Sequence, residues 1–174
     1  KGSKVLFPIA LATIMLPFQV TMIPLYGVWA KLGAINTFAP LIVPSFFGSA
    51  YNIFLLRQFF QTVPDSHVDS GRMDGASELR ILFQILMPLS KPILTTIALF
   101  TFVNGWNDFQ GPLIYLNDGK MFTLAIGLQV FLQEHRTQWE LLMAASTLFM
   151  LPMIAIFFVG QKQFIKGIVM TGFK

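Results

Sequence analysis

The segment VLFPIALATIMLPFQVTMIPLY, residues 5–26, contains no Asp, Glu, Lys or Arg. A transmembrane helix needs about 20 mostly apolar residues, so this segment is long enough to cross a bilayer. Working outward along the chain, three more segments are long and mostly apolar: 39–60, which contains Arg57, 92–116, which contains Asp108, and 141–161, which has no charged residue. The pattern predicts an all-α fold, a polytopic transmembrane helical bundle, and we expect the first two spans to be kinked or broken at prolines 17, 24, 40 and 44.

The composition of the whole chain agrees with a membrane protein. Of its 174 residues, 55% are hydrophobic and only 11% are charged, and the mean hydropathy is +0.66. A soluble domain carries roughly 25% charged residues. The net charge of +4 is scattered along the chain, which argues against nucleic-acid binding. The absence of cysteine excludes disulfides, thiolate metal sites and thiol catalysis.

The distribution of Lys and Arg predicts the orientation in the membrane. Four spans place both ends of this chain, and the loop 61–91, on the same side. Nine basic residues fall on that side and three on the other, so the first side is expected to be cytoplasmic. The two sets are Lys1, Lys4, Arg57, Arg72, Arg80, Lys91, Lys162, Lys166 and Lys174, against Lys31, Lys120 and Arg136.

The loop 61–91 is charged and is predicted to form two short helices. Pro64 suits the first turn of one helix, and Asp74-Gly75 is a turn signal that can end it. Ser77 is a candidate cap for the second helix, which Pro88 is expected to stop. The expected apolar face of that second helix consists of Leu79, Leu82, Phe83 and Leu86.

Sequence patterns of common enzyme sites are absent. The chain has no G-x-x-x-x-G-K-[ST], no H-E-x-x-H and no G-x-S-x-G, so it is not expected to bind ATP by a P-loop or to act as an enzyme. Its two histidines, His67 and His135, fall on opposite sides of the predicted membrane and cannot share a metal ion. No cofactor is expected for this chain.

Polar residues inside the third span are a candidate part of a translocation path. They are Asn104, Asn107 and Asp108, with Trp106 between them. An ionisable group within a span indicates function, and aromatic rings beside amides would suit a sugar. The alternatives are that these residues join helices, or that Asp108 lies at the water boundary. For the small and polar residues of the second span, helix packing is the favoured interpretation; these are Ser45, Gly48, Ser49 and Asn52.

The loop VPDSHVDSGRMDGASELRILFQILMPLSKP resembles the EAA loop of binding-protein-dependent ABC importer permeases. Other segments are similar to the carbohydrate-uptake branch of these permeases, which includes the second permease subunit of the maltose transporter. These segments are MLPFQVTMIPLY, KLGAINT, LRQFFQTVP, RMDGASE, PLSKP, GWNDF and FIKGIVMTGFK. The resemblance covers essentially the whole chain. It departs from the family at Asp69-Ser70-Gly71, where Glu-Ala-Ala is usual, and this replacement lowers helix propensity.

The resemblance implies the fold of a type I ABC importer permease, with four of six spans present and the missing pair expected before Lys1. It implies a bacterial or archaeal plasma membrane location and import of a sugar or related carbohydrate. The implied partners are a second permease subunit, a cytoplasmic ATPase dimer that binds the ATP, and an extracytoplasmic solute-binding protein. The loop 61–91 would couple ATPase closure to alternating access, and the tail from Lys166 to Lys174 could also reach the ATPases. The implied coupling residues are Asp69, Ser70, Gly71, Asp74, Gly75, Ala76 and Glu78.

Three other functions stay open on the sequence. An ion-driven secondary carrier would place its binding groups on broken helices near the membrane midplane. An importer of the same class could carry a solute other than a sugar. A membrane anchor or assembly subunit could use the loop 61–91 as a scaffold for a soluble protein.

Overall fold

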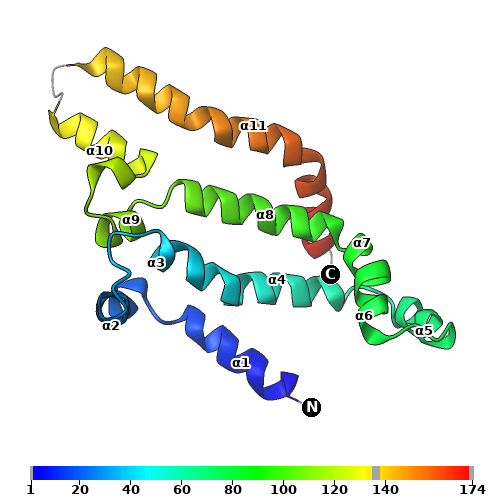
Figure 1. Ribbon diagram of the computed structural model, residues 1–174. Helices are drawn as coiled ribbons and strands as arrows, with labels where there is room; N and C mark the ends of the chain where they lie inside the picture. The colour runs from blue at the N-terminus through cyan, green and yellow to red at the C-terminus, as the bar shows by residue number, and fades with distance from the viewer. Residues whose placement is uncertain (1, 135–137, 173–174) are drawn as a thin grey trace. The chain divides into compact units, whose positions relative to one another are not determined.

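The computed structural model describes residues 2–134 and 138–172, and every regular element in these ranges is helical. The predicted all-α class is therefore confirmed. The elements, labelled in Figure 1, are α1 (Ser3–Ile14), α2 (Phe18–Lys31), α3 (Ala39–Ile42), η1 (Val43–Phe47), α4 (Ala50–Phe60), α5 (Asp65–Met73), α6 (Glu78–Ile81), η2 (Leu82–Leu86), α7 (Met87–Leu89), α8 (Lys91–Trp106), α9 (Gln110–Tyr115), η3 (Gly119–Met121), α10 (Leu124–Glu134) and α11 (Trp139–Gly172).

Two stretches are long and apolar enough to cross a membrane on their own, Ala39–Phe60 and Trp139–Gln161. Two bent pairs of helices would each add a span. The first pair, Lys4–Ile14 and Phe18–Lys31, bends by 99°, and the second, Glu78–Leu89 and Lys91–Trp106, bends by 76°. The described residues thus contain between two and four candidate spans.

Proline explains one of the expected breaks but not all of them. Pro17 precedes α2 with extended backbone, φ −62° and ψ 141°, and the chain turns there. Pro24, by contrast, lies inside α2, which continues past it. Pro88 does not stop the second loop helix either, because the chain stays helical to Leu89. A π-helical turn over Leu82–Leu86 comes just before it, and such a wide turn leaves room for the proline ring.

The described residues group into two compact units. The first contains residues 1–51 and 103–155, and the second contains 52–102 and 156–174. In the first unit, Tyr115, Leu116 and Ile126 are buried. The ring of Tyr115 stacks on Tyr26 with the centroids 6.2 Å apart.

A loop contact in the first unit joins segments far apart in the sequence. Asn36 has a left-handed backbone, φ 60°, and its N–H donates to the Tyr115 carbonyl at 2.8 Å. Its side-chain oxygen accepts the N–H groups of Asn117 and Asp118 at 2.9 and 3.0 Å. The backbone and the side chain of Asn36 therefore both join the loop after α2 to the end of α9 and the residues that follow it.

In the second unit, Phe59, Ile81 and Ile93 are buried. Ser90, fully buried, stands at the bend between α7 and α8. Its N–H and its hydroxyl both donate to the Leu86 carbonyl, at 2.9 and 2.6 Å. The bend is thus a hydrogen-bonded joint.

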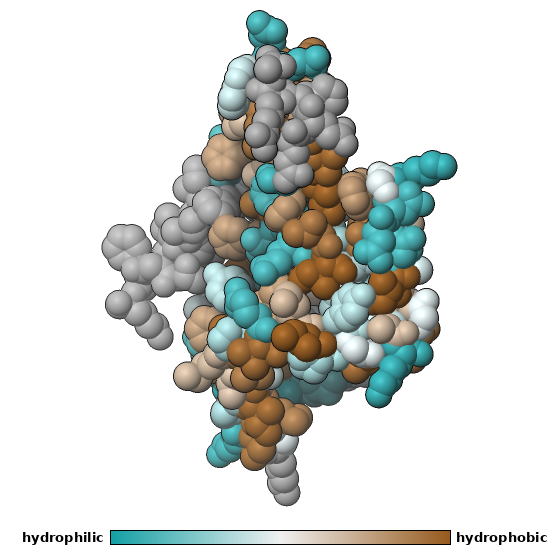
Figure 2. Space-filling model, turned by 90° about the vertical axis from the view of Figure 1, so that its left-hand side faces the viewer, coloured by the Kyte–Doolittle hydropathy of each residue, from teal (hydrophilic) through white to brown (hydrophobic). Residues whose placement is uncertain are grey.

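Many large apolar side chains lie on the surface. In α1 and α11, exposed residues include Val5, Leu6, Leu148 and Phe158. Figure 2 shows broad hydrophobic areas on one face, interspersed with hydrophilic residues. A water-soluble monomer rarely exposes so much apolar surface, whereas a chain that lies in lipid must do so.

Candidate functional site

The loop 61–91 forms a helical hairpin whose turn is fixed by a glycine. Gly75 has a left-handed φ of 74°. Its N–H donates to the Arg72 carbonyl and the Ala76 N–H donates to the Gly71 carbonyl, both at 3.0 Å. This pair of bonds is the usual glycine closure of a helix end. Ser77 then caps α6, because its side-chain oxygen accepts the N–H three residues further on at 3.4 Å. The predicted turn and cap are confirmed.

The structure brings the predicted coupling residues together around this turn. Asp69, Ser70 and Gly71 lie in the second half of α5, residues 74–76 form the turn, and Glu78 begins α6. The Ser70 hydroxyl donates to the His67 carbonyl at 3.1 Å. The helix α5 covers all three of these positions, although each differs from Glu-Ala-Ala.

Gly71 is buried where α5 meets the second helix of the hairpin. A Cβ atom at this position would lie 2.8 Å from Ile85 Cδ1 and 3.2 Å from Ile81 Cγ1. Real Cβ contacts are longer, so the glycine permits a closer approach than alanine would. The glycine costs about 1 kcal/mol of helix propensity relative to alanine, and it leaves room for the side chains of Ile81 and Ile85. Gly71 thus has a packing role that its sequence position alone did not indicate.

Exposed charges also link the two helices of the hairpin. The Arg72 Nε lies 3.0 Å from Glu78 Oε1, and its Nη1 lies 3.6 Å from Asp69 Oδ1. The hydrogen bond to Glu78, and then its negative charge, raise the pKa of Arg72 above its ordinary value. Because all three side chains are more than half exposed, the network contributes little to stability. It fixes the geometry of a charged surface.

The apolar face of the second hairpin helix differs from the expected one. Leu79 and Phe83 are 69% and 64% exposed, whereas Ile81 is 1% exposed. The face that packs against α5 is instead the one that carries Ile81 and Ile85, because these two side chains contact α5 at Gly71. The outward side chains at positions 79 and 83 share a face, being four residues apart. Together with Met73, which is 88% exposed, they give the hairpin an apolar surface.

The polar residues of the third span lie at the end of α8. The helix stops at Trp106 and α9 begins at Gln110, so the predicted span 92–116 is not one continuous helix. Asp108 Oδ1 accepts the Gly111 N–H at 3.0 Å, a bond that satisfies a donor at the start of α9. Asn104 is exposed on α8. Asp108 therefore has a local structural role.

Trp106 and Asn107 contact α11 within the first unit. The Trp106 Nε1 donates to the Phe149 carbonyl at 3.1 Å, and the two rings stack with centroids 5.7 Å apart. The Asn107 Nδ2 donates to the Val103 carbonyl at 2.8 Å and lies 3.6 Å from Met153 Sδ. Trp106 thus holds helices together.

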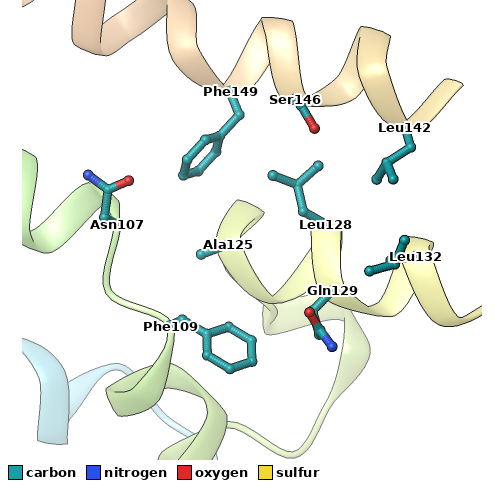
Figure 3. A pocket seen from close by; sticks show the side chains of 9 residues that line it. All are labelled: Asn107, Phe109, Ala125, Leu128, Gln129, Leu132, Leu142, Ser146 and Phe149. Carbon is teal, nitrogen blue, oxygen red and sulfur yellow. The ribbon is translucent and has the colours of Figure 1, made fainter. Parts of the chain in front are cut away.

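A cavity of about 420 Å³ opens between the 107–109 break, α10 and α11. Figure 3 shows it, with the Phe149 ring and the Ser146 hydroxyl extending from α11 towards α10. Of the predicted path residues only Asn107 lines it; Asn104, Trp106 and Asp108 do not. The lining residues are Asn107, Phe109, Ala125, Leu128, Gln129, Leu132, Leu142, Ser146 and Phe149.

Sequence reasoning missed Gln129 and Ser146. Each lies in a mostly apolar helix beside other polar residues, Ser146 next to Thr147 and Gln129 four positions before Gln133, and no spacing within either helix distinguishes it from a surface residue. Only the packing of α10 beside α11 brings them to one cavity. The break after Trp106, by contrast, had a readable signal, since Asp108 precedes Gly111 and Pro112 as a capping residue precedes a helix start. His135, one of the two histidines predicted not to share a metal ion, lies outside the described residues.

An all-helical chain with several candidate spans and a charged helical hairpin between two of them is typical of multi-pass transport proteins. Residues 1–169 match the family described as "Binding-protein-dependent transport system inner membrane component", and the chain belongs to this family.

The chain is similar to permease proteins of named transport systems. It is 34% identical over 174 residues to the arabinooligosaccharides transport system permease protein of Halalkalibacterium halodurans, covering 100% of this chain and 62% of that protein. The Bacillus subtilis protein of the same name is 37% identical with the same coverage. The sn-glycerol-3-phosphate transport system permease protein of Brucella abortus is 38% identical over 161 residues, covering 91% of this chain and 57% of that protein. The chain thus spans about three fifths of the length of these relatives.

Proposed function

We propose that this chain is part of a permease subunit of an ATP-driven importer for carbohydrates. A separate cytoplasmic ATPase dimer would bind and hydrolyse ATP, so the chain itself is not an enzyme. A second permease subunit would complete the path, and an extracytoplasmic binding protein would deliver the solute. The family supports the transport class, and the relatives for arabinooligosaccharides favour a carbohydrate.

The observation that carries this proposal is the closed α5–α6 hairpin. It exposes Met73, Leu79 and Phe83 between two predicted spans, on the side that the Lys and Arg count makes cytoplasmic. A short helical element with exposed apolar side chains suits docking into a groove of a partner protein. The charged rim of Asp69, Arg72 and Glu78 would orient it. We infer that this hairpin is the ATPase-coupling element.

The packing of the second unit suggests how a pull on the hairpin would reach the membrane. Gly71 lets α5 pack tightly on Ile81 and Ile85, so the hairpin can move as one body. The buried Ser90 joint then connects α7 to α8, and the Leu94 N–H donates to the Ser90 carbonyl at 2.9 Å. Displacement of the hairpin would therefore be passed to α8, which leads to the broken segment at 107–109.

The test is to purify the full-length chain with the ATPases and compare two tryptophan variants. Gly75→Trp places a large side chain on the hairpin turn and is expected to weaken ATPase association and solute-stimulated ATP hydrolysis. Gly33→Trp is the matched control, because Gly33 also has a left-handed φ, 66°, and also has open space around an added Cβ. By the predicted topology Gly33 lies on the other side. Full association with Gly75→Trp would contradict the coupling role.

The orientation is tested by single-cysteine labelling, because residues 1–174 contain no cysteine that would react in the background. A membrane-impermeant thiol reagent added outside cells is expected to label a cysteine at Asn117 and not one at Ser66. Labelling at Ser66 would reverse the assignment of the hairpin to the cytoplasm.

A second candidate is import of a solute other than a neutral sugar. It is favoured by the similarity to the sn-glycerol-3-phosphate permease protein. Uptake of labelled solutes of both kinds by cells with the whole transporter separates the two. An ion-driven carrier would instead import its solute without ATPase partners. Loss of solute uptake when the ATPases are removed would therefore exclude such a carrier.

A further inference from the structure

We infer that the cavity between the 107–109 break, α10 and α11 is a binding site for a neutral, polyhydroxylated solute, with Ser146 and Gln129 as specificity-determining residues. This inference rests on the proposed transport function and names the solute class and the residues. The cavity volume of about 420 Å³ falls in the range of small-molecule sites.

The chemistry of the lining carries the argument. Asn107, Gln129 and Ser146 bring two amides and a hydroxyl from three different segments to one cavity. The rings of Phe109 and Phe149 supply flat apolar surfaces beside them. A sugar has the complementary surface, because its hydroxyl groups pair with amides and its C–H faces pack on aromatic rings.

The Ser146 hydroxyl is available to such a solute. Its neighbour Thr147 donates its hydroxyl to the Met143 carbonyl at 2.8 Å, which is the common arrangement in a helix. Ser146 makes no such bond, and neither Ser146 nor Gln129 makes a side-chain hydrogen bond to another described residue. Figure 3 shows the Ser146 oxygen directed towards α10. Unpaired polar groups facing hydrocarbon would be costly, so an aqueous path is the environment that satisfies them.

A second hollow of about 230 Å³ lies beside this cavity and is apolar enough to face lipid. It shares Leu128 and Phe149 with the first cavity, yet the described residues that line it include no polar side chain; the others are Leu124, Gly127, Phe131, Ala145 and Leu148. The α10–α11 pair thus separates a polar hollow from an apolar one. The polar hollow is the one suited to a water-soluble solute.

The absence of charge in the lining sets the solute class. None of the described residues that line the cavity is Lys, Arg, Asp or Glu. A phosphorylated solute is recognised by cationic or charge-assisted donors, which these described residues do not offer. The site therefore favours a neutral sugar unit over sn-glycerol 3-phosphate.

The experiment uses the full-length chain in lipid nanodiscs with Ser146→Cys as its single cysteine. The rate of labelling by a water-soluble maleimide is measured alone, with a mixture of arabinotriose, maltotriose and raffinose, and with sn-glycerol 3-phosphate. The expected result is labelling that the neutral sugars slow several-fold and the phosphate ester does not. Thr147→Cys is the matched control and is expected to show no protection.

A second variant tests Gln129. Adding Gln129→Leu to Ser146→Cys removes one hydrogen-bonding group, which is expected to weaken sugar protection about threefold to tenfold. Any one of three results would overturn the inference. These are that the cysteine is not labelled, that no neutral sugar slows its labelling, or that sn-glycerol 3-phosphate slows it as much as the sugars do. ATPase association is measured on the same preparation. If neutral sugars slow the labelling but no ATPase is bound, the binding site is supported and the proposed importer function is refuted. If ATPases are bound but no sugar slows the labelling, only the binding site is refuted.

Discussion

Replacing Gly75 with alanine tests whether the hairpin turn is fixed by its left-handed backbone. A left-handed conformation costs an L-residue with a Cβ about 1–2 kcal/mol. No atom lies within 4 Å of a Cβ added at Gly75, so neither a clash nor a new contact changes that figure. The free energy of opening the turn should fall by this amount, which makes the open state about 5 to 30 times more populated.

Hydrogen exchange of the full-length chain in nanodiscs measures this opening directly. The reporting amides are those of Gly75 and Ala76, whose N–H groups close the turn. Asparagine tolerates the left-handed region, so Gly75→Asn is expected to raise exchange much less than Gly75→Ala. Gly119→Ala is the neutral control, because Gly119 has open space and no positive φ. Unchanged exchange in Gly75→Ala, or equal effects of Ala and Asn, would refute the reasoning.

Three further substitutions test other contacts of the structure. Gly71→Val should destabilise the hairpin by about 1–3 kcal/mol by overpacking. Adding Ile85→Ala should restore part of this stability. The resistance of the 61–91 loop to protease measures both effects. Asp108→Ala should lower stability by about 1 kcal/mol through loss of the hydrogen bond from the Gly111 N–H. Asp108→Asn keeps the acceptor for Gly111 and should cost less, and equal losses in thermal unfolding would contradict this role. Asn36→Ala should cost about 2–4 kcal/mol by removing two hydrogen bonds and straining the backbone, and a melting temperature equal to that of the unaltered chain would count against the loop contact.

The general fold could be predicted because its causes are local in the sequence. Charge-free runs such as 141–161 indicate membrane-spanning helices whatever their neighbours are, and this run lies within the candidate span Trp139–Gln161. Gly75 and Ser77 are turn and cap residues whose effect depends on a few adjacent residues, so the hairpin was predictable too. The face of its second helix was not, because it depends on Gly71 in the other helix leaving room for Ile81 and Ile85.

The candidate path was predictable only in part, because it depends on contacts across the fold. Asn107 does line the cavity, but Trp106 is turned to α11 by its bond to the Phe149 carbonyl. No residue near Trp106 in the sequence indicates that its side chain donates a hydrogen bond to a residue 43 positions away. Ser146 and Gln129 gain their importance from the same kind of distant packing.

The contact made by Asn36 has a consequence for how the chain is made. Its side chain accepts the N–H groups of residues that follow it by 81 and 82 positions. At typical synthesis rates these residues appear roughly 4 to 16 seconds after Asn36. During that interval the left-handed backbone at Asn36 lacks the bonds that hold it, so the loop after α2 cannot settle while α2 is being inserted. The contact between the two loops can therefore form only after the residues that follow α9 have been synthesised.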